Sequence, residues 1–158
     1  MKELSHIGPS GEARMVDVSD KPITERKARA SGEIRMQPHA LQAVIENSVA
    51  KGDVLAVARV AGIMAAKRTD QFIPLCHSLP ITDIQLSLQP DPTIPGVRAE
   101  AVVKATGRTG VEMEAITAVT ISLVTVYDMV KALDKTMVIE NVRLLEKAGG
   151  QSGTWSLG

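Results

Sequence analysis

Residues 109–131 read TGVEMEAITAVTISLVTVYDMVK. Thr109 and Glu112 have the T-x-x-E spacing of a capping box, which predicts a helix from about Val111 to Leu133. From Ala115 to Val126, apolar and small hydroxyl residues occupy every face, as is typical of a helix buried all round. One sheet in a domain of this size rarely encloses a helix completely. We therefore favour a helix that also packs against a second subunit over one that lies only in the core of its own domain.

The segments on either side of this helix complete a pattern of alternating strands and helices. Strands are predicted at Ala13–Val18, Ile23–Met36, Ile81–Leu88, Val97–Lys104 and Met137–Leu145, and helices from Pro38 to before Lys51 and from Val54 to Thr69. The order is strand, strand, helix, helix, strand, strand, helix, strand. It predicts an α+β fold, a ferredoxin-like antiparallel sheet with helices packed on one face.

The length of 158 residues suits one domain. We expect a flexible N-terminal arm at residues 1–12 and a single α+β domain at residues 13–158, with a mobile Gly-rich tail near 148–158. The tail motif Gly149-Gly-Gln-Ser-Gly153 lacks the G-K-[ST] of a Walker loop. It is read either as a mobile loop over an anion or as a flexible chain end.

Composition argues against several classes of partner. Lys plus Arg and Asp plus Glu both number 18, so no net charge attracts nucleic acid or a membrane surface. The single cysteine, Cys76, cannot form an internal disulfide. The first residues show no apolar signal region, and the apolar run Ala115–Met129 is too short and too polar to span a bilayer. We expect a cytoplasmic protein that binds neither nucleic acid nor membranes.

Charged residues stand only near the two ends of the long helix. Asp128 and Lys131 are three residues apart and share a face, a pattern that by itself indicates no more than an ordinary ion pair. Glu112 and Asp128 are separated by about 24 Å along the helix axis. Lys51 and His77 flank another helix of about 25 Å. One small ligand cannot reach both ends, so either two sites exist or subunits of a symmetric oligomer share one.

His77 follows Cys76 in a loop bounded by prolines. The other histidines show no metal-ligand spacing, so we predict no metal site. On pattern alone, His77 is as consistent with a structural role as with acid–base or hydrogen-bonding chemistry.

Seven collinear segments carry a family resemblance over almost the whole chain. They are Met15–Val18, Lys51–Asp53, Ala65–Thr69, Ile73–His77, Thr109–Glu114, Tyr127–Lys131, and Val142–Leu145 with the Gly-rich tail. Together they resemble the cyclic pyranopterin monophosphate synthases, the molybdenum-cofactor biosynthesis protein C family. The chain departs from the family pattern at Ser78, where the family usually has proline after the histidine, and the tail after Gly153 is short.

The resemblance implies a lyase with a ferredoxin-like fold that acts on a cyclised GTP derivative, 3',8-cyclo-7,8-dihydroguanosine 5'-triphosphate. The product is cyclic pyranopterin monophosphate, released with pyrophosphate in molybdenum cofactor (molybdopterin) biosynthesis. It also implies a homo-oligomer, a hexamer built as a trimer of dimers, with sites at subunit interfaces. The sequence shows no required cofactor, and Mg²⁺ is expected, if at all, with the triphosphate.

The resemblance also implies roles for individual residues. Three residues would be catalytic: Asp128 as a general acid or base, Lys131 as a general acid or a phosphate ligand, and Lys51 as a ligand of the triphosphate that stabilises the departing pyrophosphate. The substrate-binding candidates are Leu75, Cys76, His77, Glu112, Met113 and Glu114, followed by Arg26, Lys67 and Lys147 as phosphate candidates chosen by charge.

Two other functions fit the pattern of the residues. One is a non-catalytic nucleotide- or small-molecule-binding oligomeric module, in which Asp128→Asn costs affinity only. The other is a scaffolding subunit, which would leave a large apolar patch exposed in the purified homo-oligomer.

Overall fold

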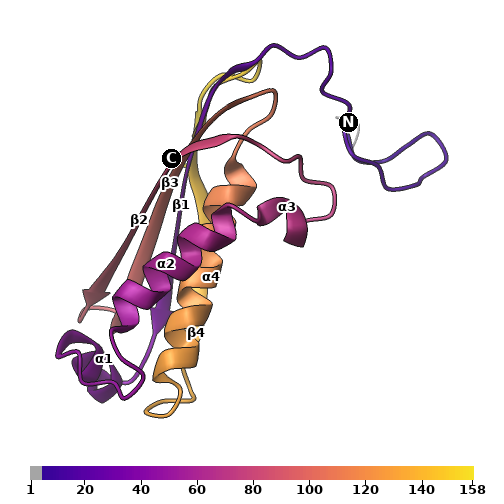
Figure 1. The fold of residues 1–158 in the computed structure, drawn as a ribbon. Coiled ribbons are helices and arrows are strands. Elements are labelled where there is room, and N and C mark those ends of the chain that lie inside the picture. Colours follow the sequence, from indigo (N-terminus) through magenta and orange to yellow (C-terminus); the bar gives the residue numbers. More distant parts are fainter. Residues whose placement is uncertain (1–4) are drawn as a thin grey trace.

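A computed structural model describes residues 5–158 and shows a single sheet with its helices on one face (Figure 1). The strands are β1 (Thr24–Arg35), β2 (Ile81–Asp91), β3 (Gly96–Gly107), β4 (Val138–Ala148) and β5 (Trp155–Ser156). The helices are α1 (Pro38–Ile45), α2 (Val54–Ala66), α3 (Thr69–Phe72) and α4 (Glu112–Val130). The strand order is β2-β3-β1-β4-β5, and all neighbours are antiparallel. The predicted α+β, ferredoxin-like class is confirmed.

The predicted strand at Ala13–Val18 is wrong. Ala13 forms only an isolated bridge with Ile7, and the rest of the segment is irregular. The neighbouring strand β1 already has β3 and β4 on its two sides, and the segment joins no strand of the sheet. Residues 1–4 of the predicted arm lie outside the described residues. At the other end of the chain, the tail contributes the short β5, which the sequence did not predict; the tail's mobility stays a prediction.

The first two helices are shorter than predicted. The first ends at Ile45, where the chain turns through Asn47 at a φ of 53°. The second is capped as expected by Asp53, whose side chain accepts a hydrogen bond from the Ala56 amide, but it ends at Ala66. The hydroxyl of Thr69 donates to the last carbonyls of α2 and begins α3 instead of extending α2.

The long helix α4 is confirmed, but its predicted capping box is not. Val111 occupies the N-cap position and makes no side-chain cap, so the helix begins too late for Thr109 to serve. By length and composition α4 could cross a membrane, contrary to the expectation from its shorter apolar run. More than half of it is instead buried inside the fold, as in the core helix of a soluble domain.

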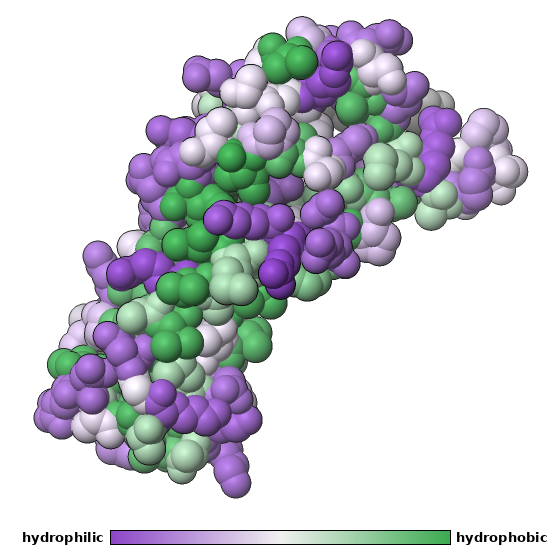
Figure 2. Space-filling model, viewed as in Figure 1, coloured by the Kyte–Doolittle hydropathy of each residue, from purple (hydrophilic) through white to green (hydrophobic). Residues whose placement is uncertain are grey.

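The two long helices lie side by side and run antiparallel across the sheet (Figure 1). Gly62 allows this close packing: a Cβ there would lie 2.3 Å from Leu86 Cδ2 and 2.7 Å from the Ala118 carbonyl oxygen. The outer surface of this layer is partly apolar, as the green areas along the helices in Figure 2 show. Its exposed apolar side chains are Val57, Val60, Met64 and Val124.

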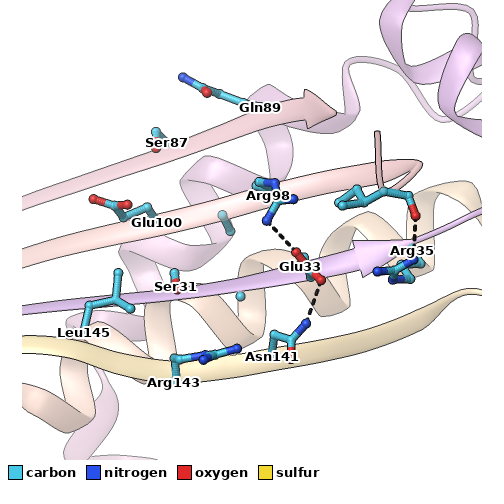
Figure 3. Close-up of a pocket in the computed structure, with 13 residues that line it drawn as sticks. Ser31, Glu33, Arg35, Ser87, Gln89, Arg98, Glu100, Asn141, Arg143 and Leu145 are labelled. Atoms are coloured by element: carbon cyan, nitrogen blue, oxygen red, sulfur yellow. Dashed lines mark hydrogen bonds and ion pairs between the residues drawn. The ribbon is translucent and has the colours of Figure 1, made fainter. Parts of the chain in front are cut away.

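The opposite face of the sheet is polar. Figure 3 shows Glu33 at its centre, with its carboxylate accepting hydrogen bonds from Arg98 Nη1 at 2.8 Å and from Asn141 Nδ2 at 2.7 Å. These side chains line a shallow hollow of about 450 Å³ that contains none of the predicted site residues. The candidate site therefore belongs to the helix layer and to the loops at its two ends.

Candidate functional site at the two ends of the helix layer

The first group of predicted residues, here called the lysine cluster, comprises Lys51, Asp128 and Lys131. Lys51 Nζ donates to Asp128 Oδ2 at 2.9 Å and to the Asp128 carbonyl oxygen at 3.0 Å. Lys131 Nζ donates to Asp128 Oδ1 at 2.7 Å. The ion pair expected from spacing alone is thus joined by a lysine 77 residues away in the sequence. All three side chains are about half exposed, so the cluster is open to a ligand.

The lysine cluster fixes the charge of its carboxylate. Hydrogen bonds from Lys131 and then Lys51 lower the pKa of Asp128 to about 2. The same contact with Asp128 raises the pKa of Lys131. At neutral pH the cluster therefore holds one carboxylate between two ammonium groups. An Asp128 that donates a proton as general acid does not fit this charge state, whereas anion binding does.

The second group lies at the opposite end of α4 and surrounds a cavity of about 660 Å³, here called the loop pocket. Predicted residues that line it are Leu75, Cys76, His77, Glu112 and Met113. They come from the loop after α3 and from the first turn of α4, which the fold brings together although they are distant in the sequence. The lining is mostly apolar with a few polar groups, as is usual for a small-molecule site.

One wall of the loop pocket is the irregular segment that precedes β1. His77 Nε2 lies 2.7 Å from the carbonyl oxygen of Val16, so Nε2 carries the proton in this contact. Arg108 Nη1 donates to the carbonyl oxygen of Ser19 at 2.7 Å and to that of Lys21. Sequence reasoning missed both Val16 and Arg108 as site components. Val16 acts through its backbone carbonyl, which any residue type would provide. The only indication of its role in the sequence was its place in the Met15–Val18 segment of the family resemblance.

Glu114 lies behind the loop pocket, buried in the first turn of α4. Only 3% of it is exposed, and its Oε2 has no hydrogen-bond partner among the described residues. Burial raises the pKa of Glu114 to about 7, aided by the nearby Glu112 and Asp70. Burial and the same carboxylates, Glu114 first among them, also raise the pKa of the Cys76 thiol. This end of the site therefore resists further negative charge.

A smaller hollow of about 240 Å³ adjoins the loop pocket, and the two share the lining residues Lys21, Thr109, Gly110 and Glu112. Arg26 and Lys147 both line it. The guanidinium of Arg26 is held by the carbonyl oxygens of Gly107 and Arg108, while Lys147 Nζ lies 3.3 Å from Glu112 Oε1. These two phosphate candidates thus stand next to the pocket, and the tail residue Gln151 joins them.

Lys67 belongs to neither group. It is the C-cap of α2 and lines a separate shallow hollow together with Ile81 and Asp83.

The chain does not bring its two groups of candidates together. Glu112 and Asp128 are part of one continuous helix, so the loop pocket and the lysine cluster are about 24 Å apart. This agrees with the distance argument made from the sequence. Within one chain, the two groups therefore cannot contact the same small ligand.

Side chains that would suit a metal ion are not grouped: residues 5–158 contain no set of three or more His, Cys, Asp or Glu residues with metal-binding geometry. The candidate chemistry in this part of the chain is that of ammonium, guanidinium, imidazole and carboxyl groups.

Comparison with known proteins identifies relatives over nearly the full length. Residues 15–150 match the model of the MoaC family. A protein of Chloroflexus aggregans is 55% identical over 97% of this chain and 93% of its own length. One of Thermomicrobium roseum is 55% identical over 98% and 93%, and one of Brucella ovis is 50% identical over 98% and 94%. Each of the three is named cyclic pyranopterin monophosphate synthase.

Proposed function

The chain belongs to the MoaC family, and on that premise we propose that it is a cyclic pyranopterin monophosphate synthase, a lyase of molybdenum-cofactor biosynthesis. The observation that carries this proposal is the similarity, at 50% identity or more over almost the entire chain, to curated relatives of that name. A family of binding modules or scaffolds would not give this uniform naming.

The proposed substrate is 3',8-cyclo-7,8-dihydroguanosine 5'-triphosphate. Its imidazole ring opens and recloses as a pyrazine, and a hydroxyl of the sugar-derived part attacks the α-phosphorus. The bond from that phosphorus to the bridging oxygen breaks, and pyrophosphate leaves. The reaction rearranges the substrate and changes no overall oxidation state, so it needs no redox cofactor. Any Mg²⁺ would enter with the triphosphate and not as a resident ion.

The lysine cluster supports a role at the triphosphate. Two ammonium groups held beside one carboxylate can each donate to phosphate oxygens and stabilise the departing pyrophosphate. Arg26 and Lys147 extend positive charge along the wall next to the loop pocket. Lys67, which faces another hollow, is the weakest of the phosphate candidates.

The loop pocket suits the ring system of the substrate. Its apolar wall, which includes Leu75, can contact the flat faces of the purine-derived rings, and Glu112 can accept their N–H groups. Glu114, just behind it, can take up or release a proton near neutral pH, since its pKa lies at about 7. His77 lines the same pocket and is a further group that can carry a proton. Its contact with the Val16 carbonyl oxygen holds the orientation of its ring.

A second copy of the chain would unite the two halves. The exposed apolar side chains of α2 and α4 are suited to a two-fold contact between helix layers. If the layers pack antiparallel, the lysine cluster of one protomer meets the loop pocket of its partner, and two equal sites form. We extend this to a cytoplasmic hexamer of three such dimers, in line with the family resemblance.

Subunit complementation tests the proposal. Lys51→Ala disables only the lysine cluster, and His77→Ala only the loop pocket. Each variant alone should release little pyrophosphate. When equal amounts are unfolded together and refolded, half of the dimers are mixed and each has one intact site, so we expect roughly a quarter of the wild-type rate. A mixture no faster than the two variants separately would contradict a shared site. Wild type that binds the nucleotide without releasing pyrophosphate would favour the binding module.

A further inference from the structure

The two oxygens of the Asp128 carboxylate are used separately. Oδ1 accepts from Lys131 Nζ at 2.7 Å, and Oδ2 accepts from Lys51 Nζ at 2.9 Å. Lys51 makes a second contact with the Asp128 carbonyl oxygen at 3.0 Å. The lysines come from different parts of the fold, the loop before α2 and the C-cap of α4. Asp128 is therefore the only described side chain that touches both ammonium groups.

Without the carboxylate, the two ammonium groups would repel each other. Lysine side chains are long and flexible, so each would move out into solvent in a different direction. With the carboxylate present, both are held in one place. An ammonium group has three donor protons, so Lys51, which uses two of them on Asp128, retains one, and Lys131, which uses one, retains two. A pair of fixed ammonium groups with free donors suits neighbouring phosphoryl oxygens.

The same contacts make proton transfer by Asp128 unfavourable. A proton added to the carboxyl group would have to replace a hydrogen bond from one ammonium group and would leave two cations side by side without their counter-charge. The low pKa of this carboxyl group, about 2, agrees with that conclusion.

We propose that Asp128 is a positioning residue, which holds the Lys51 and Lys131 ammonium groups together for the triphosphate of the substrate and transfers no proton itself. This inference rests on the proposed function for the identity of the substrate. It assigns the contact with the phosphates to the two lysines and assigns their arrangement to Asp128.

The test compares Asp128→Asn with wild type in pyrophosphate release as a function of pH. The amide keeps the size of the side chain but removes its charge. The pKa of Lys131, which Asp128 raises in the wild type, should fall, so the alkaline limb of kcat/KM should move to lower pH. KM should rise at least about tenfold, as for the loss of a charge-assisted hydrogen bond. A general acid or base would instead lose turnover with substrate affinity and the alkaline limb unchanged, and that result would overturn the proposal.

A second measurement does not depend on the reaction. Binding of inorganic pyrophosphate and the NMR titration of the Lys131 side chain can be followed in both proteins. We expect weaker binding and a lower pKa of Lys131 in Asp128→Asn; unchanged values would refute the positioning role. If wild type turns over no substrate while these two differences appear, the proposed function fails and the positioning role stands.

Asp91→Asn is the matched control. Asp91 also has a pKa of about 2, held there by Arg98 and Thr93 outside both groups of site residues. This variant should leave pyrophosphate binding and the titration of Lys131 unchanged.

Discussion

Replacing Glu114 by glutamine should change the free energy of unfolding, relative to that of the wild type, more favourably at pH 8 than at pH 5. Glu114 is 3% exposed, one of its oxygens has no described partner, and its pKa in the folded protein is about 7, against 4.5 for an ordinary glutamate. Between these two pH values the folded state binds a proton that the unfolded state has already lost. The free energy of unfolding of the wild type therefore falls as pH rises from 4.5 to 7.

The size of this effect follows from the two pKa values. The difference of 2.5 pH units corresponds to roughly 3 kcal/mol at 1.36 kcal/mol per unit. This is an upper limit, because the site can relax around the charge. The buried amide of Glu114→Gln lacks a ready partner, which costs about 1–3 kcal/mol at every pH. The pH-dependent part of the difference between variant and wild type is therefore the informative quantity.

Thermal unfolding at one protein concentration from pH 4.5 to 8.5 measures that quantity. The melting temperature of Glu114→Gln minus that of the wild type should rise with pH up to about 7 and then level off. Thr117→Val, a change at a buried residue of the same helix that carries no titratable group, should give a difference that is flat with pH. A flat difference for Glu114→Gln, or one that falls as pH rises, would refute the reasoning.

Three further changes test other parts of the structure. Gly62→Ala would push a methyl group against Leu86 and the Ala118 carbonyl, and it should lower the free energy of unfolding by about 1–3 kcal/mol in chemical denaturation, whereas Gly158→Ala, with open space around it, should not. Val60→Asp should leave the protomer folded but shift it toward monomer in sedimentation, with loss of pyrophosphate release; an intact dimer would argue against the helix-layer interface. Alkylation of Cys76 at pH 8 should be faster in Glu114→Gln, because Glu114 helps to raise the pKa of the thiol, and an unchanged rate would contradict that coupling.

Much of the fold was accessible from the sequence because its elements are strongly patterned. The apolar surface of α4 and the alternation in β1 specify their own structure type. The errors concern the exact ends of helices and the pairing of strands, which depends on the rest of the fold. The capping box at Thr109 failed because the helix begins two residues later than that motif requires, with Val111 and not Thr109 at the N-cap. The strand at Ala13–Val18 failed because a strand needs a partner, which its own residues do not reveal.

In the candidate site, too, some contacts could be predicted from the sequence and others could not. The contact of Asp128 with Lys131 follows from helix periodicity, so spacing alone predicts it. The contact of Asp128 with Lys51 spans 77 residues, and the role of Val16 comes from a backbone carbonyl. No local pattern encodes either. The burial of Glu114 is likewise a tertiary property, since a glutamate in the first turn of a helix is ordinarily exposed and suits the helix dipole.

The topology of the sheet explains why the site is divided. Strands β1 and β3 are antiparallel. The chain crosses back over the sheet in α2, which follows β1 and the short α1, and in α4, which follows β3, so α2 and α4 also run antiparallel. The residue before α2, Lys51, then necessarily lies beside the end of α4, and the loop after α3 lies beside its start. The helix layer thus carries different chemistry at its two ends. In the dimer proposed above, a second layer turned end for end by a two-fold axis would bring those two chemistries to one ligand.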